Sequence, residues 1–415
     1  MVGGVVDLGA GPLMSACPID RPTVTLSTYA EVREAMRAKD LRQALYDDGA
    51  LVMADCLLDL HGPEHRDRRR LENRLFRRET FEDYETNLLP RAIAEAVDPL
   101  AAVGRGDLVQ IGYRAVMHLT ALIAGIDVSP ANADRLEHIV KVFSKGATAV
   151  HATGDRTELF AEVSESLVEF DELFFQPSAA RRRHALADLA AGNITQNDLP
   201  RDVLTTLLQN VDALDLPDEV MRREVSFYLQ AGGHSTANAL THTLNELWSQ
   251  GDPEFVEQAR RDPAVLQRCV HEALRLHPAS PVAWRRSLAP VELRSGVEIA
   301  ENMLVVLDIE AANREESVWG ADSDQFDPYR AVPDGAHPWG LSFGAGTHAC
   351  IGMELDGGVP AEPGDAAQLF GTVALLGSAL LRAGAAPDPA DAPQIDPGSA
   401  RLHYSRYPIV FEPWS

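Results

Sequence analysis

The stretch LSFGAGTHACIGMEL, from Leu341 to Leu355, decides the fold of this chain. Its cysteine, Cys350, follows a loop that contains Gly344 and Gly346 and precedes a short helical pattern. Glycine permits backbone conformations closed to other residues and lets a loop approach a flat ligand closely. Amide dipoles at the start of a helix lower the pKa of a nearby thiol and favour the thiolate. The segment therefore has the chemistry of a metal-ligating cysteine.

The other cysteines, Cys17, Cys56 and Cys269, lack such surroundings. A lone cysteine is most often a small buried apolar residue, which is our interpretation of all three. Four cysteines scattered over 415 residues are also too few for a disulfide scaffold or a zinc site.

The residues around Cys350 resemble the haem-binding loop of the cytochrome P450 family, F-G-x-G-x-H-x-C-x-G. The six fixed positions are all present, at Phe343, Gly344, Gly346, His348, Cys350 and Gly352. The resemblance implies that Cys350 is the axial ligand to the iron of haem b, iron protoporphyrin IX. A thiolate ligand pushes electron density onto the iron and favours O–O cleavage. The resemblance also implies that His348 contacts a haem propionate and that Phe343 packs beside the sulfur.

Other motifs of the family follow in the expected order, and the resemblance extends over residues 24–411. The E-x-x-R motif is present as Glu272 and Arg275, which share a helix face at i, i+3 spacing. By itself this spacing fits a solvated surface pair. The family implies a buried structural pair near the cysteine loop instead.

Two motifs supply cations for the two haem propionates. The family's H-x-x-x-R motif is present as His65 and Arg69. The arginine that follows E-x-x-R by about ten residues is Arg285 or its neighbour Arg286. Cations that face buried carboxylates form strong hydrogen bonds, so the resemblance implies that these residues bind haem.

A second stretch, SFYLQAGGHSTANALTHTLNELW from Ser226 to Trp248, has a helical pattern weakened in its middle. Each glycine in a helix costs about 1 kcal/mol relative to alanine. In the family this helix crosses the distal face of the haem, and its core reads A-G-x-acid-Thr-Thr. The resemblance implies that the helix opens into a kink there. It places Ala231 beside the haem and implies catalytic roles for Gly232, Gly233, His234, Ser235 and Thr236.

His234 stands at the acid position of this core and Ser235 at the alcohol position. In the family the acid feeds protons towards the site of oxygen activation, and the alcohol donates a hydrogen bond there. Histidine titrates near neutral pH and serine can still donate, so the pair could be a working proton relay. Alternatively, the change marks peroxide use, oxidative bond formation without oxygen insertion, or nitrogen-group transfer. A third interpretation is that His234 is turned away and bonded within the helix groove.

The segment after the cysteine departs from the family pattern C-x-G-x-x-L-A-R-x-E. Here the insertion DGGVPAEPGD, with two prolines and three glycines, predicts a loop over 356–365 in place of a continuous helix. The loop is either a surface loop without a role or a change in the face where electron donors dock. A further helix is predicted over 366–384.

Helical periodicity dominates the chain and strand patterns are a minority, which predicts a mainly α protein with small β-sheets. The resemblance predicts the cytochrome P450 fold, with haem between the long distal helix and the proximal cysteine loop. We predict a single cytochrome P450 domain over 1–415, with residues 1–20 as a loose arm. The net charge of −25 argues against nucleic acid as a partner. The N-terminus has no run that could span a bilayer, so we expect a cytoplasmic protein without a membrane partner.

Seven arginines lie between Arg66 and Arg78 in this acidic chain. Some belong to a charged helix face, but in the family this helix borders the proximal face, where a basic patch attracts an acidic ferredoxin. We therefore expect a ferredoxin and a ferredoxin reductase that draws electrons from NAD(P)H.

The resemblance implies a soluble bacterial-type monooxygenase of secondary metabolism or catabolism that oxidises a small hydrophobic or aromatic molecule with O2. A helper protein that binds haem without catalysis is the other class, although such a protein has little reason to keep the whole motif set. The predicted substrate contacts, each of which could equally be core, are Val52, Leu57, Phe227, Gln230, Val282 and Trp284.

Overall fold

The computed structural model describes residues 22–360 and 368–412. The chain forms two compact units. Unit 1 consists of Met1–Ala44, Phe81–Ala115 and Ser235–Ser415, and unit 2 of Leu45–Thr80 and Val116–His234. The predicted arm over 1–20 and positions 361–365 of the predicted loop lie outside the described residues. The single domain over 1–415 stays a prediction.

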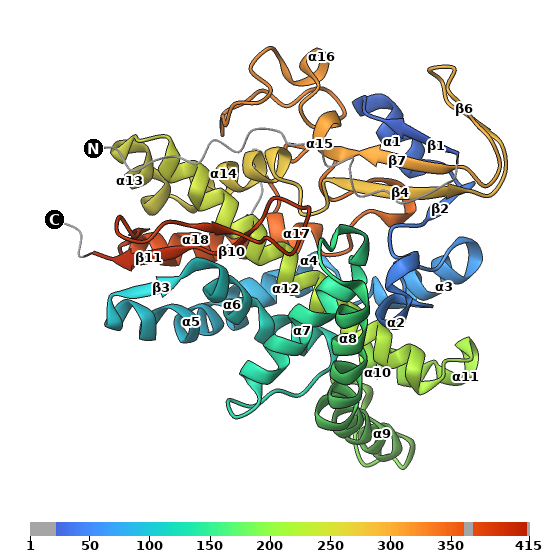
Figure 1. Ribbon diagram of the computed structural model, residues 1–415. Coiled ribbons are helices and arrows are strands. Elements are labelled where there is room, and N and C mark those ends of the chain that lie inside the picture. The colour runs from blue at the N-terminus through green and yellow to red at the C-terminus, as the bar shows by residue number, and fades with distance from the viewer. Residues whose placement is uncertain (1–21, 361–367, 413–415) are drawn as a thin grey trace. The chain divides into compact units, whose positions relative to one another are not determined.

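Helices dominate both units and the sheets are small, so the predicted fold class is confirmed (Figure 1). The largest sheet belongs to unit 1, where β7 pairs with β1 in parallel and with β4 in antiparallel orientation. β2 completes the sheet at the other edge of β4. In order across the sheet, the strands are β1 (Thr23–Leu26), β7 (Leu304–Asp308), β4 (Val282–Ser287) and β2 (Leu41–Gln43).

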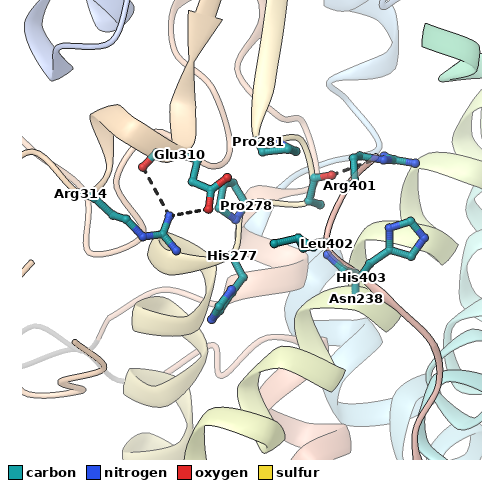
Figure 2. Close-up of a pocket in the computed structure, with 10 residues that line it drawn as sticks. Asn238, His277, Pro278, Pro281, Glu310, Arg314, Arg401, Leu402 and His403 are labelled. Atoms are coloured by element: carbon teal, nitrogen blue, oxygen red, sulfur yellow. Dashed lines mark hydrogen bonds and ion pairs between the residues drawn. The ribbon is translucent and has the colours of Figure 1, made fainter. Parts of the chain in front are cut away.

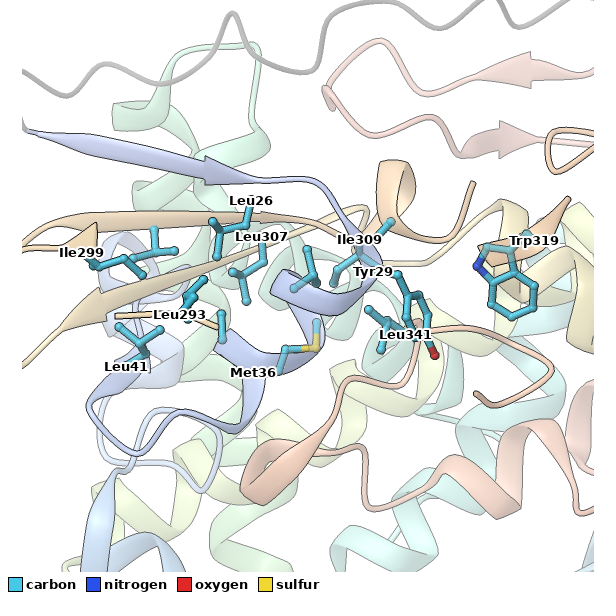
Figure 3. Packing of buried hydrophobic residues seen from close by; sticks show 14 residues of the cluster. Leu26, Tyr29, Met36, Leu41, Leu293, Ile299, Leu307, Ile309, Trp319 and Leu341 are labelled. Carbon is cyan, nitrogen blue, oxygen red and sulfur yellow. The ribbon is translucent and has the colours of Figure 1, made fainter. Parts of the chain in front are cut away.

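Helix α1 (Tyr29–Arg37) covers this sheet with its apolar face (Figure 3). The side chain of Thr28 caps the helix by accepting a hydrogen bond from the Glu31 amide. Tyr29, Val32 and Met36, at helical spacing, turn inwards to meet sheet residues such as Leu307. This core forms because strand alternation and helical periodicity direct apolar side chains to a common interior.

The remaining helices of unit 1 include α14, which carries the E-x-x-R motif, and α17, which follows the cysteine loop. Their bounds are α5 (Leu89–Val103), α13 (Pro253–Arg261), α14 (Pro263–Leu276), α15 (Ile309–Ala312), α16 (Glu316–Trp319), α17 (Met353–Gly357) and α18 (Thr372–Arg382), with the turns η3 (Tyr84–Leu88) and η7 (Gly346–His348). The smaller sheets are β3 (Arg105–Asp107), β11 (Pro408–Phe411) and β8 (Ala385–Pro387); β5 (Val291–Glu292) and β6 (Glu298–Ile299); and β10 (Tyr404–Arg406) and β9 (Gln394–Ile395).

Unit 2 is helical throughout its described elements. Its helices are α2 (Ala50–Met53), α3 (Gly62–Glu72), α7 (Ala133–Ala147), α8 (Arg156–Phe170), α9 (Gln176–Ala190), α10 (Val203–Gln209) and α11 (Val211–Leu214), with the turns η2 (Asp47–Gly49), η4 (Ala149–His151), η5 (Asp171–Phe175) and η6 (Gln196–Asp198). Three helices contribute residues to both units, namely α4 (Arg78–Asp83), α6 (Leu108–Ala124) and α12 (Asp218–Ser249). None of the helices in the described ranges combines the length and apolar character that crossing a membrane requires.

Helix α12 is continuous over 32 residues, so the glycines in its middle do not interrupt it. The predicted opening there does not take the form of a break in the helix. Gly232 instead has a packing role, because a Cβ atom at this position would lie 2.3 Å from Cγ2 of Thr120 on α6. The missing side chain therefore lets the two helices approach closely, which offsets the low helix propensity of glycine.

The cysteine loop is followed by only five helical residues, which include Asp356 and Gly357, so the predicted loop over 356–365 begins two residues too early. Gly358, with φ of +71°, ends α17 in a conformation that favours glycine. The next helix begins at Thr372, later than the sequence predicted. A glycine at the preceding position, Gly371 with φ of +86°, turns the chain into this helix and delays its start.

Candidate functional site

The cysteine loop holds Cys350 in a fixed and exposed position. The Cys350 amide donates a hydrogen bond of 2.8 Å to the carbonyl oxygen of Phe343, which closes the loop. Gly344 and Gly346 have φ values of +69° and +75°, which other residues adopt only with strain. At Gly346 a Cβ atom would also lie 3.0 Å from the carbonyl oxygen of Met36, so the loop needs glycine there twice over. His348 lies partly exposed in the turn just before the cysteine.

The other described cysteines contrast with Cys350. Cys56 and Cys269 are fully buried, and burial raises the pKa of the Cys269 thiol to about 12. Burial also raises the pKa of Cys56 well above its ordinary value. Both therefore stay protonated as small core residues, as predicted from the sequence. Cys17 lies outside the described residues.

Phe343 connects the cysteine loop to its support. Its ring makes an edge-to-face contact with Trp339, at 5.3 Å between centroids and an interplanar angle of 82°. On another side, a Cβ atom at Gly357 would lie 3.3 Å from the Phe343 ring, so α17 packs closely against it. His271 of α14 makes an edge contact with the same tryptophan and a 2.8 Å hydrogen bond to the Gly357 carbonyl oxygen.

Glu272 and Arg275 form a buried ion pair on α14, with N–O distances of 2.8 and 2.7 Å. Arg275 also donates to the carbonyl oxygen of Asn313 at 2.6 Å. The Asn313 side chain in turn accepts the amide of Leu341 at 2.8 Å and donates to Ser342 at 2.9 Å. The pair is thereby linked through Asn313 to the first residues of the cysteine stretch.

The two hydroxyl residues of α12 that belong to unit 1 differ in their surroundings. Ser235 is partly exposed, whereas Thr236 is buried. The hydroxyl of Thr236 donates a hydrogen bond of 2.6 Å to Asp356 of α17, which lies 120 residues later in the chain. Burial raises the pKa of Asp356 to about 6, an effect that the hydrogen bond partly opposes. We did not predict Asp356 as a site residue, although a carboxyl group at the first position of the insertion was a visible signal.

The central residues of α12 that belong to unit 2 have small side chains, except for His234. Ala231 is exposed, Gly232 and His234 are partly exposed, and Gly233 is buried. Ala231 is thus the exposed position in the middle of this helix, and its side chain adds little bulk there.

The predicted propionate-binding cations lie at ordered positions in their own units. In unit 1, Arg285 is buried and donates to the Gln43 side chain and to the Trp284 carbonyl oxygen, while Arg286 is partly exposed. In unit 2, His65 is buried and Arg69 donates to Asn73 at 2.9 Å. Burial, followed by the charge of Arg69, lowers the pKa of His65 to about 4.

Unit 2 contains a buried acidic cluster beside α12 that the sequence did not predict. Glu224 accepts a hydrogen bond of 2.7 Å from Arg68 and two from the Leu57 amide. Glu72 accepts a hydrogen bond of 2.5 Å from the hydroxyl of Tyr228, and its other oxygen has no hydrogen-bond partner among the described residues. Burial raises the pKa of both carboxyl groups, and for Glu72 the charge of Glu224 adds to the effect.

The predicted substrate contacts do not share one environment. In unit 2, Val52, Leu57, Phe227 and Gln230 are buried. In unit 1, Val282 and Trp284 are partly buried and pack against the core residues of β7.

Figure 2 shows a small pocket in unit 1 that contains none of the predicted site residues. The guanidinium of Arg314 is held there by the carboxylate of Glu310 at 3.1 Å, and Arg401 donates to the Ala279 carbonyl oxygen at 3.4 Å. Its other lining residues are Asn238, His277, Pro278, Pro281, Leu402 and His403.

The residues present fit a haem-thiolate group. Among the described cysteines Cys350 alone is exposed, and a thiol that ligates a metal must be accessible. Two glycines with positive φ, Gly344 and Gly346, precede it in the loop, and a loop built in this way can approach a flat ligand closely.

Comparisons with known proteins agree with this geometry. The model of the Cytochrome P450 family matches residues 178–355. Cytochrome P450 4F4 of Rattus norvegicus is 29% identical over 176 residues, which are 37% of this chain and 33% of that protein. The chain therefore matches about a third of the length of this relative.

Solved structures are similar over most of the chain. P450BioI, in complex with a hexadec-9Z-enoic acid ligated acyl carrier protein, has a TM-score of 0.73 at 21% identity, with 94% of this chain and 93% of that chain covered. The cytochrome P450 enzyme CxnD, for C–S bond formation in chuangxinmycin biosynthesis, has a TM-score of 0.69 at 20% identity, with coverage of 94% and 89%. The architecture is thus the cytochrome P450 fold, and over residues 178–355 the chain is similar in sequence to the cytochrome P450 family.

Proposed function

We propose that this protein is a haem-thiolate monooxygenase that oxidises a small hydrophobic or aromatic metabolite with O2. The observation that carries the proposal is the exposed thiol of Cys350 in a loop whose glycines have positive φ. Haem b, ligated by such a thiolate, supplies the oxygen activation. A role in bacterial secondary metabolism and a cytoplasmic location belong to the same proposal.

The cations described above would hold the haem propionates. His348 and either Arg285 or Arg286 take this role in unit 1, and His65 with Arg69 takes it in unit 2. A guanidinium group suits a carboxylate because it donates two parallel hydrogen bonds. His65 is buried and can donate a hydrogen bond to a propionate through a ring N–H.

The middle of α12 would line the part of the site where the substrate reacts. Ala231, Gly232 and Gly233 present little side-chain bulk, so a ligand can approach the helix. Ser235 can donate or accept a hydrogen bond, and so can the ring nitrogens of His234.

Electrons would come from a separate ferredoxin, reduced by a ferredoxin reductase with NAD(P)H. Within the arginine-rich stretch, Arg66, Arg74, Arg77 and Arg78 are exposed in unit 2, or in α4 at its boundary. Arg68 is instead buried against Glu224 and belongs to the interior. The exposed arginines support the docking of an acidic donor.

The proposal is tested by replacing Cys350 with alanine. The wild-type holoprotein, reduced under carbon monoxide, should show the red-shifted Soret band of thiolate-ligated haem, and Cys350→Ala should lose it. Cys269→Ala is the matched control, because it removes an equally small but buried thiol and should keep the band. A Cys350→Ala protein that keeps the thiolate band would overturn the proposal.

A second candidate function is haem-thiolate chemistry without oxygen insertion. The presence of His234 and Ser235 at the acid and alcohol positions favours it, and the neighbour CxnD, which forms C–S bonds, shows that the fold can host such chemistry. Product formed under 18O2 separates the candidates: labelled product supports the monooxygenase, and unlabelled product supports the alternative. A helper function requires a haem-loaded protein that turns over no substrate with either a ferredoxin or peroxide.

A further inference from the structure

Asp356 is a carboxyl group held against the hydroxyl-bearing turn of α12. Its only described hydrogen-bond partner is the hydroxyl of Thr236, at 2.6 Å. Asp356 is the first residue of the inserted segment DGGVPAEPGD, so the family pattern has no counterpart for it. A partly buried carboxyl group with one neutral partner is costly, so it needs a reason other than stability.

The position of Asp356 is fixed by the backbone around it. Gly358 ends α17, and a Cβ atom there would lie 2.2 Å from the Gln267 side chain. That side chain donates to the Leu369 carbonyl oxygen at 2.7 Å, and Thr372 donates to the Leu355 carbonyl oxygen at 3.0 Å. These hydrogen bonds hold the backbone on both sides of Asp356. Its carboxyl group therefore contacts Thr236 of α12 from a fixed position.

Few charged groups surround Asp356 on the elements packed against it. Its own helix carries Glu354, and α14 contributes His271, whose pKa burial lowers to about 4. Near the segment that leads into α18, the carboxylate of Glu85 accepts the Gly371 amide at 2.7 Å. On α12 the nearest titratable side chains in sequence are His234 and His242. Within the described residues, no lysine or arginine makes an ion pair with Asp356, so burial dominates its chemistry.

Thr236 directly follows Ser235, and successive residues of a helix point about 100° apart. The bond to Asp356 directs Thr236 towards the cysteine segment, which leaves Ser235 on the neighbouring part of the same turn. Holding one hydroxyl therefore fixes the backbone that presents the other.

We propose that Asp356 is a positioning residue for the Ser235–Thr236 turn, which it holds from the cysteine segment through the Thr236 hydroxyl. This inference rests on the proposed haem-thiolate function. When ionised, the carboxylate accepts the Thr236 hydroxyl, and when protonated it can donate to that oxygen instead. The orientation of the turn thus depends on pH near neutrality.

The test is a pH titration of the visible spectrum of the holoprotein, followed between pH 5 and 8. The wild type should show a transition with a midpoint near pH 6, in keeping with the pKa of about 6 for Asp356. Asp356→Asn, which keeps the shape and the acceptor but cannot titrate, should lose the transition. Thr236→Val should shift it to higher pH, and Thr236→Ser, which restores the hydroxyl, should return it.

Glu354→Gln is the matched control, since it removes one carboxyl group from the same helix and should leave the transition in place. A transition that survives in Asp356→Asn, or that disappears equally in Glu354→Gln, would overturn the inference while the haem-thiolate function stands. A wild-type protein without a thiolate spectrum would overturn both proposals.

Discussion

Two carboxyl groups in unit 1, on helices that pack against each other, are treated in opposite ways. Glu272 of α14 is buried and accepts hydrogen bonds from Arg275, from Arg330 and from the amide of Asp327. Asp356 of α17 is partly buried and receives one hydroxyl. The first carboxylate has a full set of charged partners, and the second has none among the described residues.

The difference in hydrogen-bond partners suggests different roles: Glu272 stabilises the fold, whereas Asp356 is suited to exchanging a proton. A buried ion pair with satisfied hydrogen bonds resists change, because the removal of either partner strands a charge. A carboxyl group with one neutral partner can exchange its proton at little cost, and perturbed groups of this kind occur preferentially at functional sites. Unit 2 repeats the contrast, with Glu224 paired to Arg68 and Glu72 bonded to the Tyr228 hydroxyl.

The largest effect on the free energy of unfolding is expected at Glu272, the carboxylate that is paired with Arg275. Arg275→Leu should lower the free energy of unfolding by about 3–5 kcal/mol, because Glu272 then remains buried with Arg330 as its one cation. Urea denaturation of the purified protein measures the loss. The control is Arg70→Leu, whose pair with Asp67 is more than half exposed on both sides and should matter by less than about 0.5 kcal/mol. Equal losses in the two variants would show that burial does not distinguish these pairs.

The contribution of Asp356 to the free energy of unfolding should depend on pH. The pKa of Asp356 in the folded protein, about 6, exceeds its ordinary value of 3.8. The folded state therefore binds the proton more tightly, and the wild type loses stability as the pH rises from about 4 to about 6. Asp356→Asn escapes this loss, so at pH 8 it should be more stable than the wild type by about 3 kcal/mol, with little difference at pH 4. Thermal denaturation across this range measures both, and a variant less stable than the wild type at pH 8 would contradict the assignment.

The pairing of Glu272 could be predicted from the sequence, and the contact of Asp356 could not. Glu272 and Arg275 lie three residues apart on one helix, so local periodicity and the E-x-x-R motif together indicate them. Asp356 and Thr236 lie 120 residues apart, and their contact depends on where Gly358 ends α17. Such a contact follows from tertiary packing, which no local pattern contains.

The same distinction holds for the fold. The predominance of helices over small sheets follows from short-range periodicity and was expected. The continuity of α12 through its glycines was not expected, because the Thr120 methyl group that occupies the space beside Gly232 comes from another helix. Helix-propensity scales include the energetic cost of the glycine, but they contain nothing about the neighbouring helix that leaves no room for a side chain there.

A smaller effect is expected from the hydroxyl that donates to Asp356. Thr236→Val preserves the shape of the side chain but removes the donor to Asp356, so the ionised carboxylate loses its described partner. At pH 8 the variant should be less stable than the wild type by about 1.5 kcal/mol, the scale of one hydrogen bond to a charged group. At pH 5 the loss should shrink, because the carboxyl group is then mostly neutral. Chemical denaturation at the two pH values measures the difference, and a loss that does not depend on pH would indicate a packing effect of the valine.

The smallest effect is expected in unit 2, at the hydroxyl that serves Glu72. Burial and the neighbouring charge of Glu224 raise the pKa of Glu72 well above its ordinary value, so this carboxyl group holds its proton at neutral pH. Tyr228→Phe then removes a hydrogen bond between two neutral groups, and the stacking of this ring on Phe76, at 5.5 Å, is retained. We expect a loss of about 0.5–1 kcal/mol that is the same at pH 5 and pH 7, measured by urea denaturation. A loss above about 2 kcal/mol that grows with pH would mean that Glu72 is ionised, since only a charged acceptor makes one hydroxyl so valuable. In that case two carboxylates would share the single charge of Arg68, and the parallel with Asp356 would fail.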